Sequence, residues 1–174
     1  MKNGVEQDIE NIESFYDVEK NIYNIAKILK NQDVNNISNL VNKLDKRKIV
    51  SYRGRYKMNI KTIKDIAIVN SDEIVIKDTQ TAIDFIMSVK YETNCSKIAI
   101  NKKAIIEDFF ILSTGIAGEI LQKFINYQIK FAIIGDYSKY TSKPLKDFIY
   151  ESNKGKDIFF IANENEAIQM LSKE

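Results

Sequence analysis

The chain has 174 residues, a net charge of +2 and 44% hydrophobic residues, which suits one or two small soluble domains. It contains no histidine and one cysteine, Cys95, which excludes Ser-His-Asp and Cys-His catalysis within the chain, a disulfide framework and a structural zinc site. No apolar run approaches the roughly 20 residues of a membrane span, and the acidic start lacks a signal-peptide core, so we expect a cytoplasmic protein with no membrane contact, no metal and no cofactor.

The spacing of apolar residues before Met58 is helical. Apolar side chains fall on one helix face in each of the segments 9–16, 22–29 and 37–44, and Asn31-Gln32-Asp33 supplies turn residues between the last two. We therefore predict a helical N-terminal segment over residues 1–57, followed by a second domain over residues 58–174.

A basic block follows these predicted helices. Between Lys43 and Lys64, nine basic residues stand against one acidic residue, and a glycine at 54 marks a hairpin with a basic tip. Helix, turn, helix and basic hairpin resemble the winged helix-turn-helix of bacterial transcription regulators over residues 20–58, although Lys48 replaces the usual glycine before the wing. The resemblance implies DNA contact through residues 35–57. The residues expected to contact DNA are Asn39, Asn42, Lys46, Arg47, Arg53, Arg55 and Lys57.

Two other interpretations of the N-terminal segment stay open. The basic block also fits a solvated helix end and linker, because charge runs usually face water. The helices before it also fit an extension that packs on the second domain or joins two copies into a homodimer.

After Met58 the spacing of apolar residues changes from a purely helical pattern to one that alternates between strands and helices. Two short β-branched runs separated by a turn predict a hairpin, and four helices and three further strands follow, each bounded by turn or cap residues. The predicted elements are strands 66–69 and 73–76, a helix capped by Asp78 or Thr79, strand 98–100, a helix over 114–127, strand 130–134, a helix near Pro144, strand 158–161 and a helix capped by Asn163.

The predicted order is β-β-α-β-α-β-α-β-α. Alternation of this kind is typical of an α/β fold with a mixed, mainly parallel sheet covered by helices. The order resembles the STAS domain, the fold of anti-sigma-factor antagonists. In that family a helix N-terminus after a strand carries a phosphorylatable serine or threonine. The Asp-Ser pair usual at that turn is missing here, which weakens the transfer of that property.

A closer resemblance joins residues 58–174 to a bacterial domain of unknown function, the family numbered 4180. The residues that carry the resemblance are 76–80, 91–93, 108–110, Leu112, 114–115, 117–124, 126–127, 132–133, 135–136, 147–149 and 151–155. The resemblance implies a bacterial cytoplasmic protein but supplies no established activity.

Polar residues gather where the predicted strands and helices meet. Ligands tend to bind at the carboxyl ends of strands in open α/β folds. The candidate ligand or partner residues are Thr114, Gly115, Gly118, Glu119, Asp136, Ser142, Asp147, Glu151 and Asn153.

Each of these residues also has a structural explanation. Thr114 is a natural helix cap, although its hydroxyl, like that of Ser113, would also suit phosphorylation at a helix start. The two glycines would let the helix approach the sheet closely, Glu119 would pair with Lys123, and Asp136 would cap a turn.

Three functions remain open. The first is a regulatory protein whose STAS-like domain binds a protein partner or small ligand and whose N-terminal segment binds DNA or forms a dimer. The second is a small enzyme using Asp136, Glu119 and either Lys123 or Lys143, which the missing histidine makes less expected. The third is a structural oligomer built through the N-terminal helices.

Overall fold

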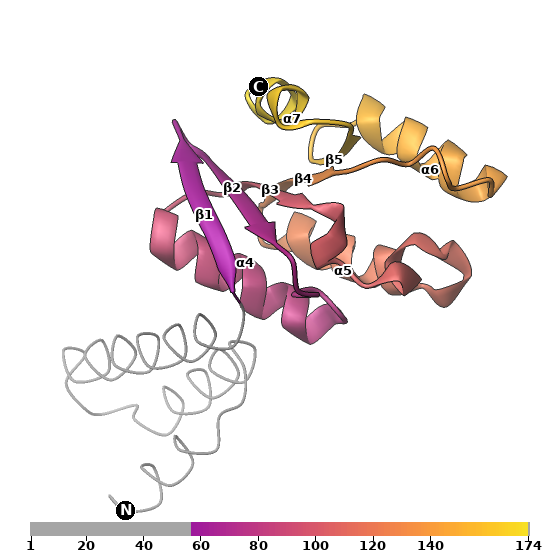
Figure 1. Cartoon of the computed structure of the whole chain (residues 1–174), viewed down its shortest axis with the longest axis horizontal. Coiled ribbons are helices and arrows are strands. Elements are labelled where there is room, and N and C mark those ends of the chain that lie inside the picture. Colours follow the sequence, from indigo (N-terminus) through magenta and orange to yellow (C-terminus); the bar gives the residue numbers. More distant parts are fainter. Residues whose placement is uncertain (1–56, 174) are drawn as a thin grey trace, which may run out of the picture. The chain divides into compact units, whose positions relative to one another are not determined.

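The computed structural model describes residues 57–173 (Figure 1). Helices and strands alternate along this part of the chain. The elements are β1 (Met58–Ile63), β2 (Ile66–Ser71), α4 (Thr79–Thr93), β3 (Lys97–Asn101), the 3₁₀ helices η1 (Lys102–Ala104), η2 (Glu107–Phe110) and η3 (Leu112–Thr114), α5 (Ile116–Asn126), β4 (Lys130–Ile134), α6 (Lys143–Lys154), β5 (Ile158–Ile161) and α7 (Glu164–Leu171).

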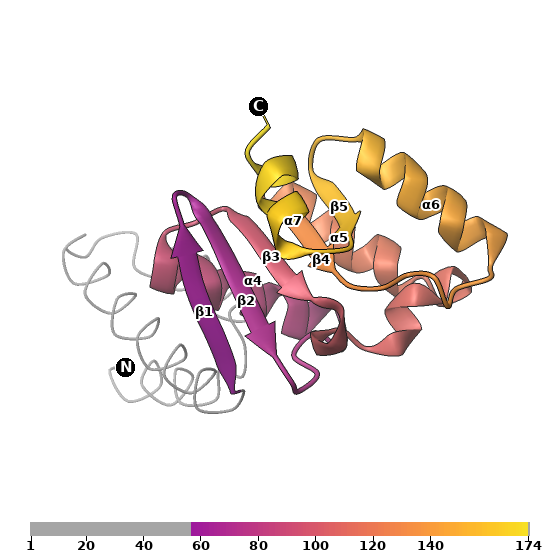
Figure 2. The ribbon, with the colours of Figure 1, turned by 45° about the horizontal axis from the view of Figure 1, so that its top comes forward.

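The five strands form one sheet in the order β1-β2-β3-β4-β5. β1 and β2 pair antiparallel, and the later neighbours pair in parallel (Figure 2). The predicted α/β class, with a mixed, mainly parallel sheet covered by helices, is confirmed.

The opening hairpin differs from the prediction. It joins β1 to β2 through a turn in which Lys64 has a positive φ of 55°. The strand at 58–63 was not predicted. The predicted strand at 73–76 is wrong. Val75 and Ile76 are buried, but both donate their N–H groups to the carbonyl of Ala104, and this loop makes an isolated bridge instead of a strand.

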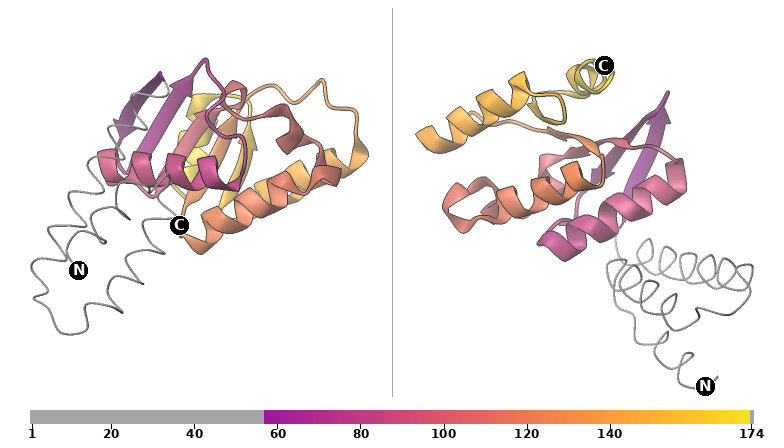
Figure 3. Two further views of the ribbon diagram at one scale, coloured as in Figure 1. Left: turned by 90° about the horizontal axis from the view of Figure 1, so that it is seen from below. Right: turned by 180° about the vertical axis from the view of Figure 1, so that it is seen from behind.

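The three crossover helices pack on one face of the sheet. Phe131 of β4 contacts Phe85 of α4 and Phe124 of α5, with ring centroids 6.4 and 4.6 Å apart. Phe160 of β5 contacts Phe148 of α6 at 5.6 Å. The register between β4 and β5 places both strand residues on the same face. Figure 3 shows α4 and α5 side by side against this face, as their contacts require.

The opposite face packs against α7. Alternate residues of β2 to β5 point to this side and form a buried cluster with Ala167 and Leu171. Lys61 of β1 pairs with Glu164 at the start of α7, at 2.7 Å. The cap of α7 is the predicted one, because the Asn163 side chain accepts the N–H of Glu166 at 3.0 Å.

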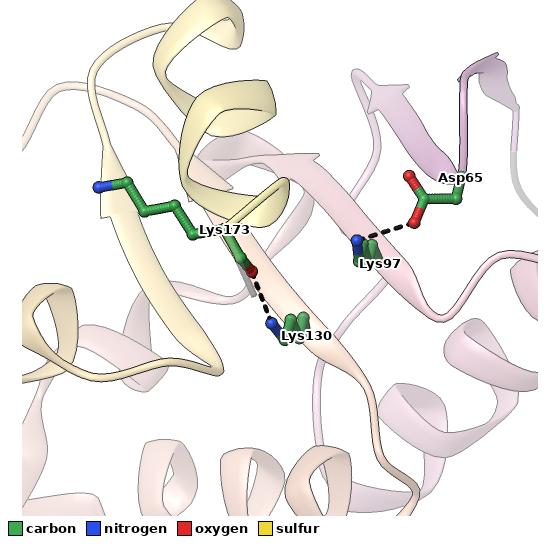
Figure 4. Close-up of polar contacts among 4 residues, drawn as sticks. All are labelled: Asp65, Lys97, Lys130 and Lys173. Carbon is green, nitrogen blue, oxygen red and sulfur yellow. Dashed lines mark hydrogen bonds and ion pairs between the residues drawn. The ribbon is translucent and has the colours of Figure 1, made fainter.

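Two lysines mark the amino-terminal edge of the sheet. Lys97 and Lys130 are in register on β3 and β4. Lys97 pairs with Asp65 in the β1–β2 turn at 2.8 Å, and Lys130 donates to the carbonyl of Lys173 at 2.9 Å (Figure 4). These lysines hold the hairpin turn and the segment after α7 against the sheet.

The predictions for the N-terminal segment fall outside the described residues, apart from Lys57, which is exposed just before β1. Those predictions are the helical or winged-helix structure of residues 1–57 and the DNA-contacting roles of Asn39, Asn42, Lys46, Arg47, Arg53 and Arg55. Within residues 57–173, no helix has both the length and the apolar character needed to cross a membrane.

Candidate binding site at the carboxyl ends of the strands

The directions of the strands indicate which edge of the sheet a binding site would occupy. β2 to β5 are parallel, so their carboxyl ends meet along the same edge. The chain leaves β4 toward α6 on one face and leaves β5 toward α7 on the other. Such a switch point, here between β4 and β5, is where ligands of open α/β sheets tend to bind, and the ends of β3 and β4 lie beside it.

Lys102 lies on this edge, directly after the end of β3. Its ammonium group sits 5.0 Å from the centre of the Phe110 ring and 4.6 Å from that of Tyr140. The lysine side chain is 23% exposed, so the cation lies beside two neighbouring aromatic rings in a partly buried setting.

The Glu107 carboxylate completes the cluster. Its Oε1 accepts the hydroxyl of Tyr140 at 2.6 Å, and its Oε2 lies 3.7 Å from the ammonium of Lys102. Burial raises the pKa of Tyr140, and the bond to Glu107 raises it further, so the phenol stays a hydrogen-bond donor. We call Lys102, Glu107, Phe110 and Tyr140 the edge cluster.

The loop between β4 and α6 is fixed by its two tyrosines. The Tyr137 hydroxyl donates to the carbonyl of Ile133 at 2.8 Å, and its ring contacts Phe110 and Phe160. Burial raises the pKa of Tyr137. Because Tyr137 anchors one end of the loop and Tyr140 the other, the loop has a defined position beside the edge cluster.

Gly135 allows β4 to end close to Lys102. A Cβ atom built on Gly135 would lie 2.6 Å from the Cβ of Lys102, closer than real Cβ contacts. The glycine therefore lets the backbone of β4 pass against the lysine stem.

Asp136 lies at this edge, as predicted, and caps a turn. Its Oδ1 accepts the backbone N–H of Ser138 at 2.8 Å. Bonds to the backbone and side chain of Ser138 lower the pKa of Asp136, so it is ionised at neutral pH.

Two other predicted carboxylates pair within their own helix. Asp147 pairs with Lys143, and Glu151 pairs with Lys154 at 3.1 Å, all on α6. Ser142 precedes α6 as its N-cap residue but makes no side-chain capping bond. These residues do not converge on one point with Asp136.

Asn153 stabilises the edge strand. Its amide donates to the carbonyl of Phe160 at 2.9 Å and accepts the N–H of Phe160 at 2.7 Å. The side chain thus satisfies both backbone groups of one β5 residue, which is a structural role.

Thr114 is not the N-cap of α5. The helix begins at Ile116, and its N-cap is Gly115, whose φ of 77° favours glycine. The Thr114 hydroxyl instead lies 3.0 Å from the carbonyl of Asp108 and 2.8 Å from that of Ile111, and accepts a weak 3.3 Å contact from the N–H of Ile116.

Gly118 and Glu119 also differ from their expected structural roles. A Cβ on Gly118 would have no neighbour within 4 Å, so close approach to the sheet does not require this glycine. Glu119 accepts the hydroxyl of Thr79 from α4 at 3.4 Å, so it links two helices in place of the expected pair with Lys123.

Sequence reasoning missed the edge cluster. A signal was available, because Lys102 follows a predicted strand directly and must therefore lie at its carboxyl end. Phe110 was assigned to the core and is indeed buried. Within the described part of the chain, no three acidic or cysteine side chains gather as metal ligands would.

Comparison with known families finds one match. A profile described as "Domain of unknown function (DUF4180)" matches residues 61–171, which is more than half of the chain and includes the whole edge cluster. Neither the curated proteins nor the solved structures contain a match.

Proposed function

We propose that this chain, which belongs to the DUF4180 family, is a binding protein that holds a small ligand at the carboxyl ends of its parallel strands. The observation that carries the proposal is the edge cluster. It brings a half-buried cation, a phenol donor and two aromatic rings from two connections, β3–α5 and β4–α6, to the edge where ligands of α/β sheets bind.

The surrounding carboxylates support binding over catalysis. General acid-base chemistry needs groups that converge on one reacting atom. Asp136 is bonded to its own turn, Glu119 to Thr79, and Asp147 to Lys143. The enzyme alternative would require these groups to leave their partners, whereas a binding role leaves them in place.

A regulatory use of the bound ligand fits the order of the elements, which resembles that of STAS domains. In this proposal the ligand stabilises the β4–α6 loop against η2 through the edge cluster. In the same proposal the N-terminal segment binds DNA or forms a dimer.

A ligand screen tests the proposed function. The full chain is heated with panels of carboxylates, phosphates, nucleotides and amines, and a true ligand raises the unfolding temperature. Lys102→Met should remove that shift, whereas Lys130→Met, at the opposite edge, should keep it. Stabilisation that survives Lys102→Met, or conversion of the ligand followed by NMR, would overturn the proposal.

The basic block supports a second proposal, that residues 35–57 contact DNA. Of its described members, Lys57 is exposed and free to take part, whereas Lys61 already pairs with Glu164. Binding through such a block should weaken steeply with salt. In a fluorescence anisotropy assay, alanine at Lys46, Arg47, Arg53 and Arg55 together should abolish duplex binding at low salt. Equal binding by that variant would refute DNA contact and favour the dimer or linker interpretation.

A further inference from the structure

We propose that Lys102 and Tyr140 form a receptor for a carboxylate group, and that Glu107 occupies this receptor until a ligand carboxylate replaces it. The inference rests on the proposed function, since it names the ligand class for the same edge. Its basis is the geometry of Glu107, whose two oxygens face two different donors. Tyr140 donates to one oxygen at 2.6 Å, and the ammonium of Lys102 lies 3.7 Å from the other.

The donors are held firmly. The Lys102 ammonium lies over two rings, and the Tyr140 ring contacts those of Phe110 and Tyr137 at 5.4 and 6.4 Å. The backbone of Gly135 lies against the aliphatic part of the Lys102 side chain, since a Cβ built on Gly135 would overlap it. The two donors therefore keep their places whether or not Glu107 is present, which is the condition for a preorganised site.

The acceptor is held by one hydrogen bond, from Tyr140 at 2.6 Å, and by a weak ion pair. The Glu107 side chain is 67% exposed, and its 3.7 Å separation from Lys102 is longer than a hydrogen bond. An ion pair at this distance, with its carboxylate in water, contributes little. Glu107 opens the short helix η2, which the buried rings of Phe109 and Phe110 anchor. Rotation of the Glu107 side chain into water would thus free the receptor without unfolding η2.

The receptor fits a carboxylate better than a phosphate. It offers one donor to each of two oxygens and a single cation to balance one negative charge. Asp136 follows Gly135 at the same edge and is ionised, so a doubly charged group would meet repulsion.

Removing Glu107 should expose the receptor. The test titrates acetate, succinate and inorganic phosphate into the isotope-labelled full chain and follows amide NMR shifts near Lys102. Glu107→Ala should bind acetate at least about tenfold more tightly than the wild type, the effect of one charge-assisted hydrogen bond no longer competed for. In that background, Lys102→Met should abolish binding and Tyr140→Phe should weaken it.

Glu151→Ala is the matched control. Glu151 is 68% exposed and pairs with Lys154 on α6, so its removal frees a lysine of similar pairing but outside any receptor. Lys154 also lies over one ring, that of Tyr150 at 4.0 Å, but its side chain is 54% exposed against 23% for Lys102, so Glu151→Ala should not raise the affinity for acetate. Glu107→Gln, which keeps the side-chain volume, serves if Glu107→Ala does not fold.

Three results would overturn the inference. They are unchanged acetate affinity in folded Glu107→Ala or Glu107→Gln, equal gain in the Glu151→Ala control, and tighter binding of phosphate than of acetate. A ligand from another chemical class that stabilises the wild type through Lys102 would overturn the carboxylate receptor while leaving the proposed binding function in place.

Discussion

Gly135→Ala adds one methyl group where the end of β4 touches Lys102. The new Cβ would lie 2.6 Å from the Cβ of Lys102, and 3.1 and 3.4 Å from its Cδ and Cγ. Two carbon atoms in van der Waals contact need about 3.5–4 Å, so one backbone must move by about 1 Å. The Cβ of Lys102 cannot rotate away as the end of the side chain could.

We expect Gly135→Ala to lower the free energy of unfolding by about 2 kcal/mol, within the range for overpacked sites. That corresponds to a fall of about 5–10 °C in Tm for a unit of this size, measured by circular dichroism. Gly118→Ala is the control, because its Cβ meets nothing within 4 Å, and a helical glycine replaced by alanine should gain about 0.5–1 kcal/mol.

Two double variants locate the cause. Lys102→Gly removes the clashing Cβ and should relieve most of the cost of Gly135→Ala, whereas Lys102→Ala keeps the Cβ and should relieve little. We expect a coupling free energy of about 1 kcal/mol or more between Gly135→Ala and Lys102→Gly, and less between Gly135→Ala and Lys102→Ala. If Gly135→Ala melts at the wild-type temperature, the close approach of β4 to Lys102 is not a constraint and the reasoning fails.

Three further variants test the local contacts. Thr114→Ala loses the bonds from the threonine hydroxyl to two carbonyls before α5. It should lower the free energy of unfolding in urea by about 1 kcal/mol, and an unchanged value would show that those bonds do not stabilise the fold. Asn153→Ala removes the side-chain amide that pairs with both backbone groups of Phe160. It should lower the free energy of unfolding by about 2 kcal/mol, and a smaller loss than that of Thr114→Ala would contradict this expectation. Asp136 has a lowered pKa in the fold, so its contribution is present above its unfolded pKa and disappears as the pH falls through its folded pKa. Wild type and Asp136→Asn should therefore differ in Tm at pH 6 and converge below pH 3.8; a constant difference would argue against the bond to Ser138.

The sequence predicted the buried strands better than the exposed one. The limits of β4 and β5 match the prediction, because each is a short apolar run bounded by turn or polar residues. β1 alternates apolar and polar residues beside the basic block and is half exposed, and no strand was predicted there. The apolar run at 73–76 looked like a strand, but its hydrogen bonds go to Ala104, a partner that local pattern does not reveal.

The candidate site was predictable in position but not in composition. The strand pattern placed Asp136 just after the carboxyl end of β4, where the structure has it, and its role toward a ligand stays a prediction. The edge cluster depends on contacts among Lys102, Glu107 and Tyr140, the outermost of which are 38 positions apart in the sequence, and no local spacing links them. Asn153 of α6, also named as a candidate, bonds to both backbone groups of Phe160 in β5, a structural role that local pattern did not reveal.

The edge strand β5 is partly protected against pairing with a strand of another molecule. In this edge strand the carbonyls of Asp157 and Ile161 accept N–H groups from β4, so by alternation the groups of Phe160 face outward. Outward backbone groups on an edge strand are a template for pairing with another molecule. Asn153 presents an amide to both groups of Phe160 and occupies that template at its centre. A second chain would have to displace Asn153 before adding a strand to this sheet, so the asparagine helps keep the sheet at five strands.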